Sequence, residues 1–227
     1  MKTCYVCLKW GQKYSADYVN KLAAMIRRWG DPHTPIYCYT DDPTGIDQSV
    51  HILPIEPQHD FETWWFKIPL LVHPKLKEFD VKVLFDLDVI IHGKVEGLFN
   101  RSTDNLTVCM AYWKDPAILA DKQEKNTMYN SSVMIWKDAS YIYDHFIQDP
   151  EKYMTIYKGV DRFMWHEKLA VDTLPPGIVY SYRKGANLCD TEPFVHRPLY
   201  DVCLFHGYPK QTDLPEVAFV KECWHEL

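Results

Sequence analysis

Two aspartates stand two positions apart inside a long apolar run, and this pair is the part of the sequence best suited to chemistry. The run extends from Val83 to Ile91 and is interrupted by Asp86 and Asp88, with Leu87 between them. Carboxylates among apolar side chains are costly to bury unless a cation or hydrogen-bond donors compensate their charge. Side chains at positions i and i+2 of an extended chain project to the same side, so both carboxylates can bind one Mg²⁺ or Mn²⁺. The pattern favours a metal site over an Asp-rich turn satisfied by backbone N–H groups.

A strand that ends just before the aspartates would place them where α/β proteins bind their ligands. The segment from Val81 to Phe85 is apolar apart from Lys82, which is typical of a buried strand. In open α/β sheets, ligands bind beyond the carboxyl ends of the strands. Upstream, strands are expected at 3–9, 36–40 and 50–53, with a helix capped by Ser15 and extending to Trp29 between the first two. This alternation predicts an α/β sandwich with a mostly parallel central sheet.

The rest of the chain continues the same organisation. Further strands are expected at 106–111, 132–136, 178–182 and 202–205, and helices at 138–146 and 161–169. A helix capped by Asp60, with a kink or a new first turn at Pro69, would carry one apolar face made of Phe61, Trp64, Trp65, Ile68 and Leu71. No repeat, low-complexity tract or linker interrupts the sequence, so a single domain spanning residues 1–227 is expected.

Composition and charge exclude several classes of protein. The chain has 227 residues, of which 47% are hydrophobic and 15% aromatic, and its net charge is −6. An acidic chain lacks the basic surface that nucleic-acid binding needs. No apolar run reaches the roughly 18 residues of a membrane-spanning helix. The N-terminus has the pattern of a first strand rather than of a signal peptide.

The seven cysteines indicate a reducing compartment. Their number is odd and most lie in apolar runs, so they are expected to be reduced core residues of a cytoplasmic protein. Cys4 and Cys7 have a spacing that metal sites use, but no second pair follows them. A structural role inside a strand is therefore favoured for both.

The aspartate pair alone does not define a reaction. Phosphatases of the haloacid-dehalogenase type also carry Asp-x-Asp after a strand, and their nucleophile would here be Asp86. Against this class, the pair lies in mid-chain and is followed by Val89-Ile90 in place of Thr or Gly-Thr. The later segment 159–161 is only a poor approximation to their second acidic motif. The abundant aromatic residues leave a third alternative, a non-catalytic module that binds a sugar or a nucleotide.

Further motifs resemble those of the GT-A glycosyltransferases, most closely glycosyltransferase family 8, which includes glycogenin and galactosyltransferases. They occur in the family's order along nearly the whole chain. Lys67 precedes the aspartate strand, and the stretch 129–136 with Asn130 resembles an Asn-Ser/Thr-Gly motif, although Ser132 replaces the Gly. Asp161 stands at an expected helix start. The stretch 205–210, Phe-His-Gly-Tyr-Pro-Lys, resembles a His-x-x-Gly-x-x-Lys-Pro-Trp motif with compressed spacing.

The resemblance implies a GT-A fold and a metal-dependent glycosyltransferase. The donor would be a UDP-sugar, with UDP-glucose or UDP-galactose expected, and the hexose would pass to an unknown acceptor with retention of its anomeric configuration. Asp88 would bind the metal directly, Asp86 would bind metal, ribose or both, and His206 would be the third ligand. This set suits Mn²⁺ somewhat better than Mg²⁺. Lys210 and Lys67 would contact the phosphates.

The remaining donor contacts follow from positions in the expected fold. The base and ribose should lie near the ends of the first two strands, where the candidates are Trp10, Gly11, Tyr14 and Asp41. An aromatic ring would stack on uracil and Asp41 would accept a bond from its N–H, although plain loop and cap roles fit these residues nearly as well. Leu87 and Gly207, which belong to the two motifs, complete the expected donor contacts.

The reacting sugar would face Asn130 and Asp161, which orient the donor in retaining relatives. An inverting enzyme would instead need a catalytic base, for which Asp161 or Glu167 is available. Three tryptophans are candidates for the acceptor side, with core packing as the alternative: Trp64, Trp65 and Trp165.

Overall fold

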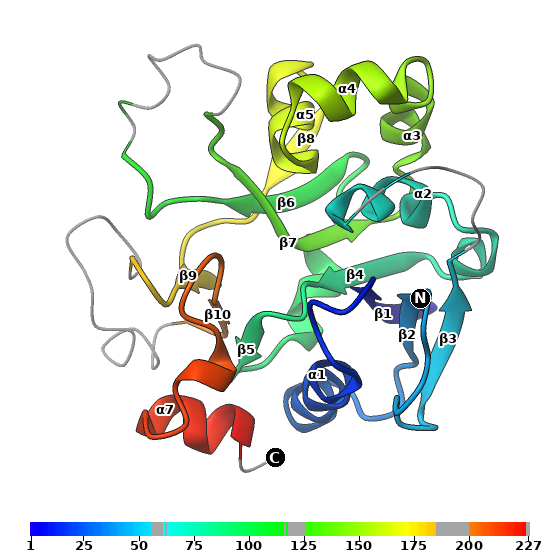
Figure 1. The fold of residues 1–227 in the computed structure, drawn as a ribbon. Helices are drawn as coiled ribbons and strands as arrows, with labels where there is room; N and C mark the ends of the chain where they lie inside the picture. The colour runs from blue at the N-terminus through cyan, green and yellow to red at the C-terminus, as the bar shows by residue number, and fades with distance from the viewer. Residues whose placement is uncertain (56–60, 62, 116, 118–125, 185–199, 226–227) are drawn as a thin grey trace.

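The computed structural model describes residues 1–55, 61, 63–115, 117, 126–184 and 200–225. Through its centre runs a seven-stranded sheet (Figure 1) with the order β3 (Val50–Pro54), β2 (Ile36–Thr40), β1 (Thr3–Lys9), β4 (Val81–Phe85), β7 (Tyr129–Trp136), β6 (Leu106–Met110) and β8 (Val171–Thr173). The first four strands are parallel, β7 is antiparallel to both of its neighbours, and β8 is parallel to β6. The predicted α/β fold with a mostly parallel sheet is confirmed.

Helices cover both faces of this sheet. One face packs against α1 (Ala16–Trp29), and the other packs against α2 (Lys67–Leu71), α3 (Ser140–Phe146), α4 (Pro150–Ile156) and α5 (Val160–His166). Short 3₁₀ turns connect these elements at Thr63–Phe66, Pro74–Glu78, Glu96–Arg101 and Gln211–Asp213. Within the described residues, no helix combines the length and apolar character needed to cross a membrane.

The alternating side chains of β1 divide the core into two parts. Tyr5 and Cys7 pack on the α1 side of the sheet, whereas Cys4 and Val6 pack on the opposite side. Successive strand residues point to opposite faces, so two cysteines three positions apart are directed away from each other. Cys4 and Cys7 therefore cannot share a metal ion. The six described cysteines are buried, and Cys189 lies outside the described residues.

A second, smaller sheet begins directly after the aspartates. Its order is β5 (Val89–Ile91), β10 (Val202–Leu204) and β9 (Val179–Ser181), with β10 antiparallel to β5 and parallel to β9. Its buried residues belong to the same hydrophobic core as α1, and the C-terminal helix α7 (Ala218–Val220) and the turn Lys221–His225 also pack in it. The apolar run of the sequence is thus two strands in two sheets, and the aspartates lie at their junction.

The prediction of one apolar helix before β4 is wrong in one respect. The chain forms a 3₁₀ turn at Thr63–Phe66, and α2 then starts at Lys67 with Pro69 in its first turn, as one of the two predicted alternatives had it. A 3₁₀ turn has about three residues per turn, so the helical face is not continuous across the junction. Trp64 is 44% exposed as a result, whereas Trp65 is 5% exposed. The expected cap, Asp60, lies outside the described residues.

Candidate functional site

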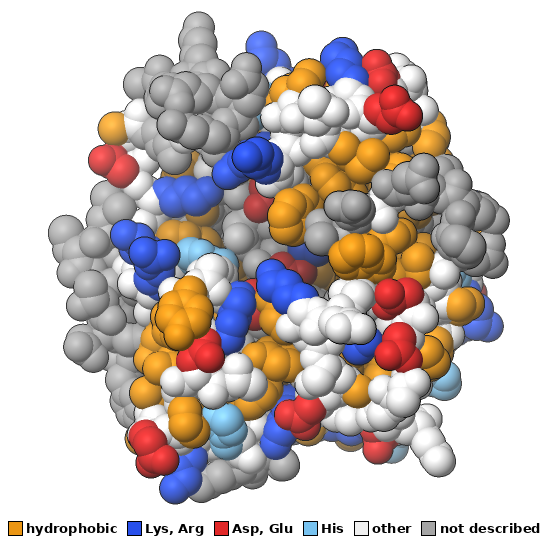
Figure 2. Space-filling model, viewed as in Figure 1, with side chains coloured by type: hydrophobic (Ala, Val, Ile, Leu, Met, Phe, Trp, Pro, Cys, Tyr) orange, Lys and Arg blue, Asp and Glu red, His pale blue; other side chains and the backbone are white. Residues whose placement is uncertain are grey.

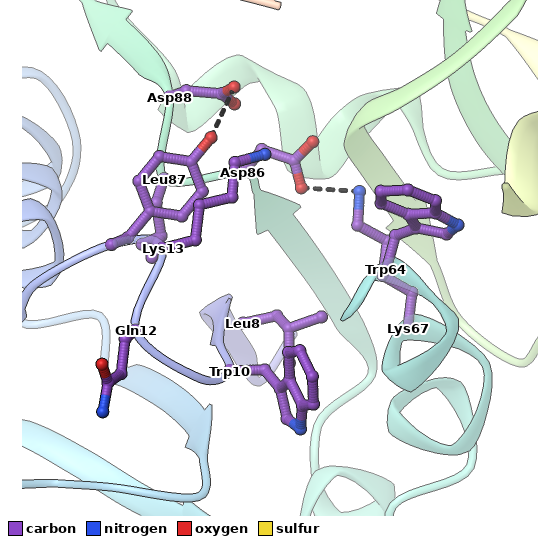
Figure 3. A pocket seen from close by; sticks show the side chains of 10 residues that line it. Leu8, Trp10, Gln12, Lys13, Trp64, Lys67, Asp86, Leu87 and Asp88 are labelled. Atoms are coloured by element: carbon purple, nitrogen blue, oxygen red, sulfur yellow. Dashed lines mark hydrogen bonds and ion pairs between the residues drawn. The ribbon is translucent and has the colours of Figure 1, made fainter. Parts of the chain in front are cut away.

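The aspartate pair lies in the wall of a pocket beyond the carboxyl ends of β1 and β4. The pocket has a volume of about 190 Å³ and is lined by Leu8, Trp10, Gln12, Lys13, Tyr14, Trp64, Lys67, Asp86, Leu87 and Asp88. Figure 3 shows the two tryptophans on one side of it and the aspartates beside Lys13 and Lys67. On the face drawn in Figure 2, Lys and Arg side chains gather around a central hollow in which acidic side chains are visible.

A buried lysine holds Asp86. Lys67 opens α2, and its Nζ lies 2.6 Å from Asp86 Oδ1. The same ammonium donates to the carbonyl oxygen of Ser131 at 2.9 Å and to the Ser131 Oγ at 3.2 Å, so its three N–H groups all have partners. Burial raises the pKa of Asp86, the Lys67 charge opposes that rise, and the negative charge of Asp88 adds to it. The fold thus supplies the counter-charge that a buried carboxylate needs.

Ser131 also connects this ion pair to Asp161. The backbone N–H of Ser131, on β7, donates to Asp161 Oδ1 at 3.1 Å, and Asp161 stands in the first turn of α5. The Asn130 side chain bends back on its own strand, where its Oδ1 accepts a hydrogen bond from the Ser132 N–H at 3.0 Å. The structure therefore brings Lys67, Asp86 and Asp161 together around one serine, with Asn130 next to it in the chain.

Asp88 is held by two side chains from loops. Its Oδ2 accepts a hydrogen bond from the Tyr14 hydroxyl at 3.0 Å and forms an ion pair with Lys210 Nζ. The Lys210 ammonium also donates to the carbonyl oxygen of Phe205 at 2.8 Å. Burial raises the pKa of Tyr14, and the neighbouring Asp88 charge raises it further. Tyr14 is one of the residues expected to contact the nucleotide base, but in this structure its hydroxyl donates to Asp88.

His206 follows β10, and its ring is held by a hydrogen bond at one nitrogen and by stacking on one face. Its Nε2 forms a hydrogen bond with the Ser181 Oγ at 2.7 Å, and its ring stacks on Trp113 with the centroids 5.3 Å apart. Burial lowers the pKa of His206, the Asp88 charge opposes that shift, and three cations add to it: Lys114, Lys210 and Arg183. The histidine is close enough to Asp88 to sense its charge, but its own hydrogen bond goes to Ser181.

Three of the candidates for contact with the base and ribose, Trp10, Gly11 and Tyr14, lie in the loop after β1, and the fourth, Asp41, follows β2. The Gly11 N–H donates to both carboxylate oxygens of Asp41, at 3.2 and 3.1 Å, and Gly11 has a φ of 61°, which favours glycine. The Trp10 ring packs against Phe66 with the centroids 5.7 Å apart and lines the pocket. Asp41 thus clamps the loop that presents Trp10.

The other predicted residues differ in their surroundings. Leu87 is 2% exposed and its side chain is part of the core, and Gly207, with a φ of 79°, lies beside Arg183. Glu167 accepts a bond from the Tyr157 hydroxyl at 2.7 Å and contacts His145 Nε2 at 3.0 Å, which engages it in the packing of α3, α4 and α5. Of the three tryptophans, Trp64 lines the pocket, Trp65 packs in the core against Phe146, and Trp165 packs against Tyr129.

The side-chain atoms available as metal ligands fit a divalent cation in part. Carboxylate oxygens are the ligands that Mg²⁺ and Mn²⁺ prefer, and Asp86 and Asp88 present them from one strand end. In the described part of the chain, no three His, Cys, Asp or Glu side chains are grouped so as to hold a metal ion. The two carboxylates instead face the ammonium groups of Lys67 and Lys210. A cation at Asp86 and Asp88 would therefore enter a site that already contains positive charge.

Several residues of the site are absent from the sequence-based set. Gln12 and Lys13 line the pocket, and Ser131, Ser181 and Trp113 fix the residues that the motifs identify. Three of them carry a sequence signal: Gln12 and Lys13 lie between Trp10 and Tyr14 in the loop after the first strand, and Ser131 lies in the stretch 129–136. Ser181 and Trp113 act through contacts between distant parts of the chain.

The chain is similar over nearly its whole length to solved structures of a galactosyltransferase. One is the galactosyltransferase LgtC in complex with donor and acceptor sugar analogues, with a TM-score of 0.60 and 14% sequence identity, over 98% of this chain and 95% of that chain. Another is an active-site mutant of LgtC, with a TM-score of 0.61 and 13% identity, over 98% and 94% of the two chains. No protein-family model and no curated protein matches the sequence. The likeness confirms the GT-A fold that the motifs implied.

Proposed function

We propose that this protein is a glycosyltransferase that uses a UDP-sugar as donor and Mn²⁺ or Mg²⁺ as cofactor. The observation that carries the proposal is the pair Asp86 and Asp88 at the end of a central strand, in the wall of a pocket with aromatic side chains, in a chain of GT-A fold. The similar LgtC structure contains donor and acceptor sugar analogues. The donor sugar is proposed to be glucose or galactose, and its transfer to retain the anomeric configuration. Residues 1–227 are proposed to act as one domain.

The arrangement of charges suits this reaction. In glycosyl transfer the bond from the anomeric carbon to the diphosphate breaks, an acceptor hydroxyl forms the new bond and loses its proton, and the leaving diphosphate gains negative charge. A divalent cation held by Asp86 and Asp88 supplies electrostatic stabilisation of that charge. Lys67 and Lys210 contribute positive charge from the same wall. His206 would be the third ligand, and coordination through its Nε2 would require this nitrogen to give up its hydrogen bond with the Ser181 hydroxyl.

The remaining residues have roles in binding and orientation. Trp10, on the loop that Gly11 and Asp41 close, offers an aromatic face to the base. Asn130 and Asp161 are proposed to face the donor sugar, and the hydrogen bond from the Ser131 N–H keeps Asp161 close to the Lys67–Asp86 pair. The exposed Trp64 is the available aromatic surface for the acceptor side, because Trp65 is buried.

Calorimetric titration with UDP, with and without Mn²⁺, tests the proposal. Wild-type protein should bind UDP in a Mn²⁺-dependent manner, and Asp88→Asn should lose most of that dependence. Asp172→Asn is a matched control, because Asp172 accepts a bond from Thr103 on the β8 edge and does not line the pocket. Metal-independent binding, or full binding by Asp88→Asn, would count against the proposal.

Turnover separates the two other classes of function. A screen of UDP- and GDP-sugars for slow donor hydrolysis should give activity with UDP-glucose or UDP-galactose. Ligand binding without hydrolysis of any nucleotide sugar would favour a non-catalytic module. Phosphate release from simple phosphoesters, with a covalent aspartyl-phosphate on Asp86, would identify a phosphatase.

A further inference from the structure

The two lysines of the aspartate pair are held in different ways. Lys67 is 4% exposed, stands on a helix and directs its three N–H groups to Asp86 Oδ1, the Ser131 carbonyl and the Ser131 Oγ. Lys210 stands on a turn, where its ammonium contacts Asp88 Oδ2 and the Phe205 carbonyl and lies over the Tyr14 ring, 5.8 Å from the ring centroid. Its side chain is 17% exposed, compared with 5% for that of Lys67. Lys67 is held by three hydrogen-bonding partners on regular elements, whereas Lys210 is held on a turn by two such partners and a weaker contact with an aromatic ring.

The backbone at Lys210 is anchored independently of its side chain. The Lys210 N–H donates to Asp213 Oδ2 at 2.7 Å, inside the turn that leads into Gln211–Asp213. The ammonium is connected to this anchored backbone by a flexible four-carbon stem. Lys210 can therefore change its ionic partner without any change in the fold around it.

Charge balance explains why such an exchange would occur. Asp86 and Asp88 are neutralised by Lys67 and Lys210. A divalent cation added alone would leave two extra positive charges in a site that is largely shielded from water, and a nucleoside diphosphate brings about two to three negative charges. Either ligand alone is opposed by uncompensated charge, whereas the two together come close to neutrality. A cation on Asp88 also competes with the ammonium that already occupies its Oδ2.

We propose that Lys210 is an exchangeable counter-ion that makes cation and diphosphate binding depend on each other. Before ligands bind, its ammonium neutralises Asp88, and when the cation binds Asp88 the ammonium passes to the diphosphate. Lys67 stays on Asp86 throughout. This role rests on the proposed function and goes beyond it, because it assigns the coupling between cofactor and donor to one side chain. By linkage, UDP tightens Mn²⁺ binding by the same factor as Mn²⁺ tightens UDP binding.

A binding cycle with Mn²⁺ and UDP tests this role without any measurement of turnover. Free Mn²⁺ is followed by electron paramagnetic resonance with and without UDP, and UDP binding by calorimetry with and without Mn²⁺. In the wild type, each ligand should tighten the other by about 10-fold or more, within the usual 5- to 150-fold range of coupling. Lys210→Met should bind Mn²⁺ alone more tightly than the wild type and bind UDP–Mn²⁺ more weakly, so its coupling should be smaller and limited to the direct attraction between Mn²⁺ and the diphosphate.

Two comparisons make the outcome decisive. Lys75→Met removes a lysine that pairs with Glu78 and does not line this pocket, so it should not tighten Mn²⁺ binding in the absence of UDP. Lys210→Arg retains the charge and should retain the coupling. If Lys210→Met is folded by circular dichroism, yet binds Mn²⁺ alone no more tightly than the wild type and keeps the wild-type coupling, the counter-ion role is overturned while the proposed function stands. If the wild type binds neither ligand, both are overturned.

Discussion

The site is assembled from two regions that hold their side chains by different means. On the central sheet, Asp86, Lys67 and Asp161 are joined through the backbone and side chain of Ser131, on regular elements. On the small sheet, His206 and Lys210 follow the three-residue strand β10 and stand in the segment between it and the turn Gln211–Asp213. In the first region, the charged side chains are held in place by the folded backbone. The second places charge on side chains whose partners can change when a ligand arrives.

The physical origin of this difference is the length of the strand pairing in each region. β4 is paired on both sides, by β1 and β7, and all five of its residues are buried. β10 is also paired on both sides, but its pairings with β5 and β9 extend over only three residues each. Long pairings define the direction of a side chain more strictly than short ones. The comparison predicts that loss of a charged side chain in the central region affects stability most, and that loss of one near β10 affects ligand response.

The largest expected effect is that of Lys67→Met. This change leaves the partly buried Asp86 without a counter-charge and removes two hydrogen bonds to Ser131, so the free energy of unfolding should fall by about 2 kcal/mol. Lys210→Met leaves Asp88 with the Tyr14 hydroxyl as a donor and should cost only about 1 kcal/mol. Urea unfolding followed by tryptophan fluorescence measures both losses.

Equal losses for the two methionine variants would show that the two regions do not differ in the way described. Lys67→Arg serves as the control for charge, because it keeps a cation beside Asp86 but cannot reproduce the geometry of the ammonium. We expect its loss to lie between those of the wild type and Lys67→Met.

A smaller effect is expected in the pH dependence of stability. Burial lowers the pKa of His206, so the folded protein binds this proton less readily than the unfolded chain does. The corresponding stability is present above the unfolded value of about 6.5 and is lost as the pH falls through the folded pKa. Between pH 7.5 and 5.5, the wild type should therefore lose more unfolding free energy than His206→Gln, by up to roughly 1 kcal/mol.

Urea midpoints at the two pH values measure this difference. Lys114→Met removes one of the positive charges that lower the pKa of His206, so it should reduce the acid-induced loss without abolishing it. An acid-induced loss in His206→Gln as large as in the wild type would remove His206 as its source.

Much of the central region could be predicted from the sequence, because its signals are local. The apolar run before Asp86 indicated β4, and the spacing of the aspartates placed both carboxylates at one strand end. The small sheet was harder to predict, because β5 continues the same apolar run and only its pairing with β10 separates it from β4. Trp64 was expected to share one helical face with Trp65, because nothing in the sequence marks the 3₁₀ turn that separates their directions and exposes Trp64.

The ion pairs were the least predictable part of the site. Lys67 and Lys210 were expected to contact phosphates, but the sequence did not indicate that their ammonium groups face Asp86 and Asp88. Such contacts join positions 19 and 122 residues apart, and they depend on how the two sheets meet. Local patterns identify which residues carry charge, whereas tertiary packing decides which charges become partners.

The smallest expected effect is that of Ser131→Ala, which is best compared with Ser181→Ala in the other region. Ser131→Ala removes only the Oγ that accepts from Lys67 at 3.2 Å, while the Ser131 carbonyl and N–H still bind Lys67 and Asp161. Its cost in unfolding free energy should be about 0.5 kcal/mol. Ser181→Ala removes a fully buried Oγ that accepts from the Lys184 N–H and also bonds His206 Nε2, so it should cost about 1.5 kcal/mol. Urea unfolding of the two variants in parallel resolves this difference. A larger loss for Ser131→Ala than for Ser181→Ala would mean that the central region depends on this side chain rather than on its backbone.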